Sequence, residues 1–90
     1  MSAFKYEVIE QLFIQLFQDV SEIFTITETQ EVTSFIEEGE YGLALETFVD
    51  IVIEENKRIS PSALKAIEEL ASAMQITSIF DWDNVRKFVI

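Results

Sequence analysis

The central segment of the chain, residues 41–55, reads YGLALETFVDIVIEE. Its apolar residues cover a wide arc of a helix: Ala44, Leu45, Phe48, Val49, Ile51, Val52 and Ile53. A helix that is apolar over more than one narrow stripe is buried on several sides, because each apolar face needs a neighbour. The pattern therefore predicts that this segment is the central helix of the fold.

Two segments before the central one also place apolar residues at the three- and four-residue spacing of a helix face. The first, from Ala3 to about Phe24, is the longest. The second contains Thr27 and, three residues later, Gln30, which is the pattern of a capping box. Gly39 stands where a left-handed residue ends a helix. Both segments are therefore expected to be helices.

A fourth helix is expected after the central one. Ser60 and Pro61 supply an N-cap followed by proline at the first helical position. One stripe of this helix is apolar: Leu64, Ile67, Leu70, Ala71 and Met74. In the break before it, Lys57 and Arg58 are placed to complement the negative end of the central helix.

The tail allows two interpretations. Asp81 could cap a short fifth helix in which Phe80 and Val85 form a hydrophobic staple. Residues 76–80 and 87–90 could equally be extended.

The predicted fold class is all-α. We expect one domain over residues 1–90, built as a small antiparallel four-helix bundle with a short C-terminal appendage. The appendage is expected to pack Trp82 and Phe88 onto the bundle, with Trp82 as a plug rather than an exposed binding residue.

The composition excludes much of enzyme chemistry. The chain has no Cys and no His, which removes thiolate nucleophiles, imidazole bases, disulfides and Cys/His zinc sites. Residues 81–84, DWDN, lack the glycine and the final glutamate of a calcium loop. A bundle of 90 residues also rarely encloses the cleft that paired catalytic carboxylates need. We therefore expect no enzyme activity, no cofactor and no metal site.

Charge is distributed unevenly along the chain. Six Lys and Arg against 17 Asp and Glu give a net charge of -11. Residues 1–55 hold 13 acids and one Lys, a net charge of -12, whereas residues 56–90 hold four acids and five bases, a net charge of +1. This sign disfavours nucleic acid and anionic membranes as partners and favours a cationic partner. The N-terminus does not resemble a signal peptide and no apolar run is long enough for a membrane span, so a cytoplasmic location is expected.

The central helix has an acidic side. Glu46, Asp50 and Glu54 fall together on it, and like charges at this spacing cost about 0.2–0.5 kcal/mol per pair. The preceding turn adds further acids, and an amphipathic tyrosine among them suits a protein-binding surface. The candidate partner-binding residues are Glu37, Glu38, Glu40, Tyr41, Glu46, Asp50 and Glu54. The same pattern also fits a merely solvated side of a central helix, with Tyr41 partly in the core.

A more specific signal comes from FIEEGEYGLALE at residues 35–46, ISP at 59–61 and EELASAM at 68–74. This region resembles the MafI family of small immunity proteins, which belong to polymorphic toxin and contact-dependent inhibition systems. The most specific part is GEYGLALE at residues 39–46. The resemblance implies a non-enzymatic bacterial protein that binds and neutralises the toxic C-terminal domain of a cognate toxin.

The resemblance also implies the chemistry of the partner. Many toxins of such systems are nucleases with basic clefts for phosphate, and an acidic surface complements such a cleft. Within the shared region, Gly39, Leu45 and Phe48 are expected to be structural, because they suit a tight turn and a core. A homodimer remains open.

Two other functions compete with this one. The first is an acidic helical adaptor, or a nucleic-acid mimic that inhibits a nucleic-acid-binding regulator. The second is an acyl carrier protein, whose phosphopantetheine arm needs a serine in an Asp-Ser-Leu-like triplet at a helix start. The nearest candidate, Ser21 in DVSEI at residues 19–23, is expected inside the first helix and has no such triplet.

Overall fold

Four long helices and two short ones make up the fold. The computed structural model describes the backbone of residues 2–90 and the side chains of residues 5–90. The elements are α1 (Ser2–Asp19), α2 (Ile26–Glu37), α3 (Tyr41–Glu54), α4 (Pro61–Ala73), the 3₁₀ turn η1 (Thr77–Ile79) and α5 (Trp82–Arg86). The described residues form no strand, so the predicted all-α class is confirmed.

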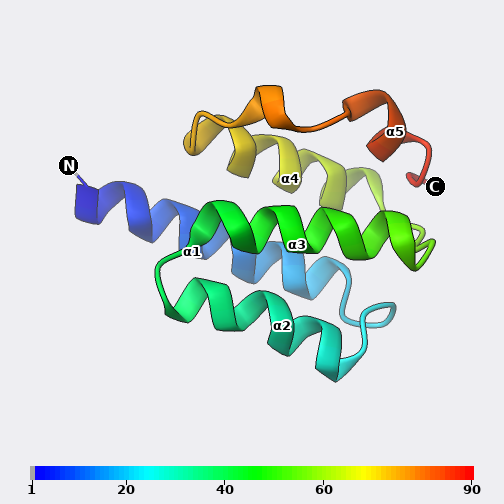
Figure 1. Ribbon diagram of the computed structural model, residues 1–90, viewed down its shortest axis with the longest axis horizontal. Coiled ribbons are helices and arrows are strands. Elements are labelled where there is room, and N and C mark those ends of the chain that lie inside the picture. Colours follow the sequence, from blue (N-terminus) through cyan, green and yellow to red (C-terminus); the bar gives the residue numbers. More distant parts are fainter. Residues whose placement is uncertain (1) are drawn as a thin grey trace.

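Successive long helices run in opposite directions, as in an antiparallel bundle (Figure 1). α1 packs beside α4, and α2 packs beside α3. α3 also contacts α4 and α5, so it has neighbours on several sides. The predicted four-helix bundle is confirmed.

The core is centred on α3. Six of its residues are buried, as its broad apolar arc predicts: Ala44, Leu45, Phe48, Val49, Ile51 and Val52. The Phe48 ring stacks on Phe24 with centroids 4.6 Å apart and meets Phe17 at 6.5 Å. No charged or polar side chain is buried within the described residues. The core is therefore held by apolar packing, with the aromatic rings of three segments meeting at α3.

The first helix is shorter than predicted. It ends at Asp19 rather than near Phe24, and the next residues form a turn that buries Val20 and Phe24. The apolar residues keep the spacing of a helix through this turn because the side chains of Val20 and Phe24 are both buried in the core. Ser21, expected inside the first helix, therefore lies in the turn.

The capping box of α2 also lies two residues earlier than predicted. Thr25, not Thr27, is the N-cap: its side chain accepts from the backbone N–H of Glu28, and its own N–H donates to Glu28 Oε1 at 2.9 Å. Thr25 and Glu28 have the same spacing as Thr27 and Gln30. The charged Glu28 carboxylate interacts more favourably than a glutamine with the positive end of a helix, which favours the earlier box.

The sequence predicted that Lys57 complements the negative end of α3, but its side chain makes other contacts. Its Nζ lies 2.9 Å from Glu28 Oε1 and donates to the backbone carbonyl of Ile23 at 2.9 Å. Arg58 donates instead to the carbonyl of Lys87 at 3.0 Å. Both cations therefore connect the α3–α4 turn to segments that are distant in the sequence.

Of the two structures that the sequence left open for the tail, the structure contains the short helix. Asp81 caps the predicted short helix α5 by accepting from the backbone N–H of Asn84. Residues 87–88 continue as a turn rather than an extended segment. Only Val89 forms an isolated bridge with Ile59, and Ile90 donates its N–H to the Ile59 carbonyl at 2.9 Å. The segment from 76 to 80 contains the turn η1 and is not extended.

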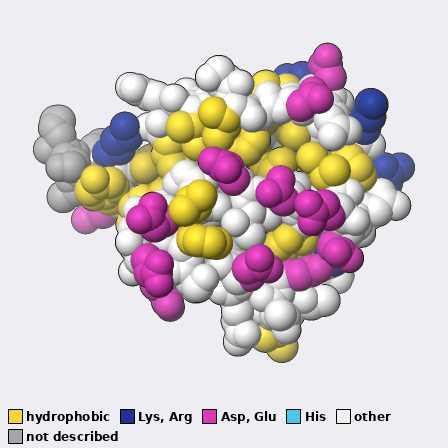
Figure 2. Space-filling model, viewed as in Figure 1, with side chains coloured by type: hydrophobic (Ala, Val, Ile, Leu, Met, Phe, Trp, Pro, Cys, Tyr) yellow, Lys and Arg dark blue, Asp and Glu magenta, His cyan; other side chains and the backbone are white. Residues whose placement is uncertain are grey.

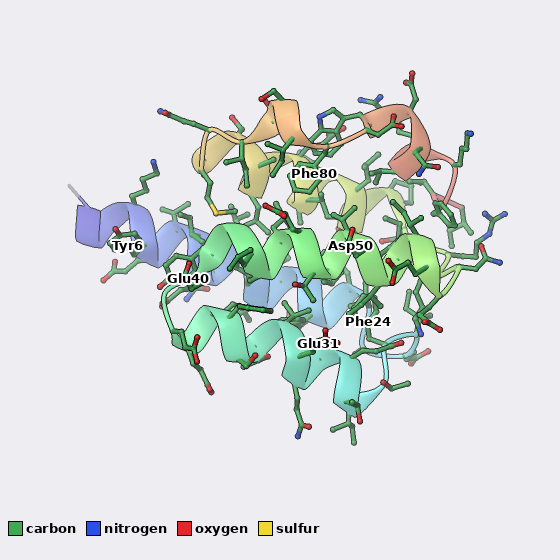
Figure 3. All side chains as sticks on the ribbon, in the orientation of Figure 1. Tyr6, Phe24, Glu31, Glu40, Asp50 and Phe80 are labelled. Carbon is green, nitrogen blue, oxygen red and sulfur yellow. The ribbon has the colours of Figure 1, made fainter. Side chains whose placement is uncertain are left out.

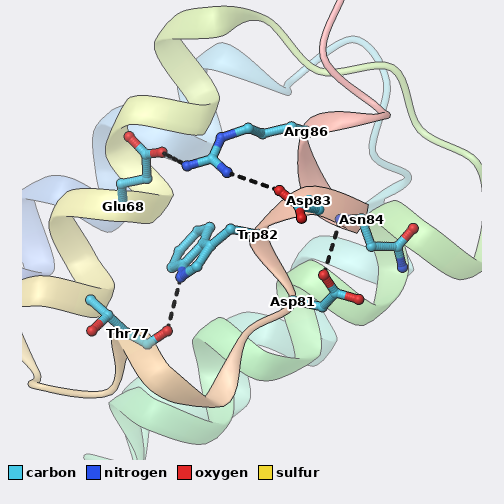
Figure 4. Close-up of polar contacts among 7 residues, drawn as sticks. All are labelled: Glu68, Thr77, Asp81, Trp82, Asp83, Asn84 and Arg86. Atoms are coloured by element: carbon cyan, nitrogen blue, oxygen red, sulfur yellow. Dashed lines mark hydrogen bonds and ion pairs between the residues drawn. The ribbon is translucent and has the colours of Figure 1, made fainter.

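Trp82 connects α5 to η1 within the tail (Figure 4) and packs against the core of the bundle. Its indole N–H donates to the Thr77 carbonyl at 2.8 Å, and its ring lies 5.3 Å from that of Phe80. Arg86 adds contacts to Glu68 at 3.4 Å and to Asp83 at 3.6 Å. Because Trp82 and Phe88 are half-buried against the core, the predicted role of Trp82 as a plug is confirmed.

Candidate partner-binding surface

Four side chains of α3 point away from the core. Leu43, Glu46, Asp50 and Glu54 are exposed, and Thr47 beside them is half-buried. These are the positions that the helical spacing placed on one side. The three acids are therefore exposed on one side of α3, as the spacing predicted; their role in binding stays a prediction.

A neighbouring acid from α2 extends this surface. Glu31 is exposed and lines a shallow groove of about 250 Å³ between α2 and α3, together with Asp50, Glu54 and Glu55. Thr47 and Ile51 form its less polar part. We call the surface formed by Glu31, Glu46, Asp50, Glu54 and Glu55 the acidic face.

Glu31 and Glu55 were missed by the sequence reasoning. The position of Glu31 depends on the antiparallel pairing of α2 with α3, and no pattern within one helix reveals such pairing. Glu55, the residue that caps α3, follows directly after Glu54. This adjacency is visible in the sequence and would have placed Glu55 beside the acids of α3.

Three further predicted acids lie at the corner between α2 and α3. Glu37, Glu38 and Glu40 are exposed around Gly39. Gly39 has a φ of +76° and donates its N–H to Ile36 at 3.0 Å, which confirms it as the left-handed residue that ends the helix. Figure 3 labels Glu31, Glu40 and Asp50, which spread along α2 and α3.

Tyr41 does not lie on the acidic face. It precedes Asp50 by nine positions, or about two and a half helical turns, so the two side chains leave α3 in opposite directions. The Tyr41 ring lies 5.7 Å from that of Tyr6, and its hydroxyl donates to Glu10 Oε2 at 2.6 Å. This hydrogen bond to a carboxylate is the main reason why the pKa of Tyr41 is raised. Tyr41 therefore faces α1.

None of the five carboxylates of the acidic face forms an ion pair among the described side chains, although Lys57 pairs with Glu28, which lines the same groove. Among the side chains of residues 5–90, the ion pairs are Lys57 with Glu28 and Arg86 with Glu68 and Asp83. Figure 2 shows Asp and Glu side chains gathered over α2 and α3, with Lys and Arg at the edges of the view. Unneutralised charges of one sign sum to a potential that attracts cationic molecules from a distance.

Within the described residues, no three acidic side chains converge closely enough to hold a metal ion. In the same residues, no helix combines the length and the apolar character that crossing a membrane requires.

The region that resembles the MafI family builds the corner and the first turns of α3. Leu45 and Phe48 are fully buried, so the prediction that they are structural is confirmed. Comparisons of the chain with family models, with curated proteins and with solved structures find no match. Membership of the MafI family stays a prediction.

Proposed function

We propose that this protein is an immunity protein that binds the basic toxic domain of a cognate toxin through its acidic face. The observation that carries the proposal is the set of exposed carboxylates on α2 and α3, none of which forms an ion pair among the described side chains. The resemblance of residues 35–46 to MafI immunity proteins supports the same role.

Such an arrangement neutralises a nuclease in two ways. Long-range attraction speeds the encounter with a basic toxin, and the carboxylates occupy the cationic groups that would otherwise hold substrate phosphate. Glu46 and Asp50 lie in the exposed middle of α3, where a partner excludes water most completely. No bond is made or broken, so inhibition is stoichiometric.

The molecule is large enough for this role. Its two longest dimensions are 36 and 27 Å, and the view in Figure 2 looks onto that face. A standard interface buries about 800 Å² on each partner, which a face of this size can supply.

The experiment has two stages. The tagged protein is first isolated from its native strain at low and high salt, and proteins recovered in near-equal amount are identified by mass spectrometry. Affinity for the recovered domain is then measured for wild type and for the double variant Glu46→Lys/Asp50→Lys. We expect at least about a hundredfold loss of affinity and a weaker salt dependence.

A matched control variant is Glu22→Lys/Glu69→Lys. Both residues are exposed and lie outside the acidic face, and the variant changes the net charge by the same amount. Equal loss of affinity in both variants would show that binding depends on the net charge of the protein and not on the acidic face. Recovery of a nucleic-acid-binding regulator instead of a toxin would replace the immunity function with the adaptor or mimic function.

A further inference from the structure

The edge of the bundle between α1 and α2 is the least closely packed. α1 packs chiefly on α4, and α2 packs chiefly on α3, whereas α1 and α2 approach each other much less closely. Between them lies a groove of about 730 Å³. This apolar groove lies on the side of α2 that faces α1, whereas the acidic face lies on the side that faces α3.

The base and walls of the groove are hydrophobic. Phe13 is fully buried beneath it, and Phe17 and Ile36 are half-buried along it. Ile14 forms part of a wall and leaves 49% of its surface exposed. A partner side chain that covered Phe17, Ile36 and Ile14 would remove apolar surface from water, which favours binding.

The rim of the groove is acidic. Glu10, Glu37 and Glu38 line it, and none of its lining residues is Lys or Arg. Glu37 and Glu38 have no ion-pair partner among the described side chains, and Glu10 accepts only the Tyr41 hydroxyl. A cationic segment with apolar side chains complements both features of the groove.

Charge also argues against a second copy of this chain as the occupant. The chain carries a net charge of -11, and its N-terminal 55 residues contain one Lys. Two acidic rims would repel each other across a self-association interface.

We infer that the groove between α1 and α2 docks a basic amphipathic helix of the protein partner. Its apolar residues lie on Phe17, Ile36 and Ile14, and its Lys or Arg residues meet Glu37, Glu38 and Glu10. A groove between two helices suits a third helix, whose apolar positions recur every three or four residues. The inference rests on the proposed function only in taking the partner to be a basic protein, and it adds a second contact surface with a different chemistry.

The test uses the whole chain and a synthetic peptide of about 20 residues, in which Leu repeats at helical spacing and the other positions are Lys and Ala. Binding is followed through the isoleucine methyl groups by NMR. Ile14 and Ile36 report on the apolar groove, Ile51 reports on the acidic face, and Ile79 lies outside both. We expect the Ile14 and Ile36 signals to shift first and to saturate at a micromolar dissociation constant.

Matched variants test the apolar and charged parts separately. Ile14→Glu should weaken the peptide at least about tenfold, whereas Ile79→Glu should not, although Ile79 is similarly exposed at 52%. Glu37→Lys/Glu38→Lys should weaken binding more than the control Glu22→Lys/Glu69→Lys. The second pair keeps the test decisive if Ile14→Glu disturbs folding, which circular dichroism would detect.

Other outcomes overturn the inference. Shifts confined to Ile51 would move the contact to the acidic face and leave the proposed function intact. Equal binding of a peptide with Ser in place of Lys would remove the requirement for a basic partner. Absence of binding near millimolar peptide, or a dimer in sedimentation that Ile14→Glu dissociates, would exclude the groove as a partner site. None of these results decides whether the recovered partner is a toxin.

Discussion

Lys57 reaches from the α3–α4 turn to Glu28 in the first turn of α2, where Nζ and Oε1 lie 2.9 Å apart. The same ammonium group donates to the Ile23 carbonyl and lies 5.7 Å from the centre of the Phe24 ring. One cation thus joins the α1–α2 turn, the start of α2 and the end of α3. The pair is mostly shielded from solvent, with exposed side-chain fractions of 15% and 18%.

Removing this cation should destabilise the fold. Lys57→Met keeps the aliphatic stem but leaves the Glu28 carboxylate and the Ile23 carbonyl without their partner, at a cost of about 1–3 kcal/mol. Urea unfolding measures the loss. Lys65→Met, at an exposed position of α4, is the control and should cost much less. Equal costs would show that the Lys57 contacts contribute little to stability.

The Glu28 contribution should depend on pH. The pKa of Glu28 lies below its ordinary value of 4.5, first because the Thr25 backbone N–H donates to it and second because Lys57 does. A lowered pKa in the folded state means that the stabilisation is complete above the ordinary value and is lost as the pH falls through the lowered one.

The measurement is the difference in unfolding free energy between wild type and Glu28→Gln. We expect this difference to be largest near neutral pH and to shrink below about pH 4.5. Using a difference cancels the general effect of protonating the many other acids. A flat profile for Glu28→Gln would contradict the linkage.

The two glycines at the α2–α3 corner should respond oppositely to alanine. Gly39 has a φ of +76° and open space around its Cα, so Gly39→Ala meets no clash and loses about 1–2 kcal/mol through backbone strain. Gly42 lies in α3, where an added methyl would meet only Ile76 Cδ1 at 3.9 Å. Gly42→Ala should stabilise by up to about 1 kcal/mol. Thermal unfolding of both variants measures the contrast, and equal shifts would refute the backbone explanation.

The boundary between what the sequence predicted and what it missed has a physical cause. The buried side of α3, the Ser60–Pro61 start of α4 and the Gly39 end of α2 depend on interactions within one segment, and all three were predicted correctly. The contacts of Lys57 and Tyr41 depend on which helices become neighbours. Local periodicity carries no information about those pairings.

The acidic face also combines residues whose position could be predicted from the sequence with a residue whose position could not. The shared exposure of Glu46, Asp50 and Glu54 follows from a four-residue spacing, so it could be predicted. The approach of Glu31 could not, because it comes from the packing of α2 on α3. Thr25 and Thr27 show a further limit: two capping patterns of the same spacing lie two residues apart, and the spacing alone does not select between them.

Tyr41 should ionise at a higher pH than an ordinary tyrosine. Its hydroxyl donates to Glu10, and ionisation would break this bond and place two negative charges together. Its pKa is thus raised above the ordinary value of 10.0, and the associated stabilisation is present below that value and lost as the pH rises through the higher one. Absorbance titration of a Tyr6→Phe background isolates Tyr41. Adding Glu10→Gln should lower the midpoint, and an unchanged midpoint would show that Glu10 is not the cause.

Asp50 provides the sharpest distinction between a binding surface and a merely solvated one. It lies four residues from both Glu46 and Glu54, so Asp50→Lys turns two repulsions into two attractions and should stabilise the free protein by about 1 kcal/mol. The gain should shrink at about 1 M salt, because screening weakens both terms. The neutral variant Asp50→Asn should give roughly half the gain. If the acidic face binds a basic toxin, the same Asp50→Lys variant should hold the toxin less tightly even though it is more stable. A variant that is more stable and binds the toxin equally well would show that Asp50 does not contribute to toxin binding.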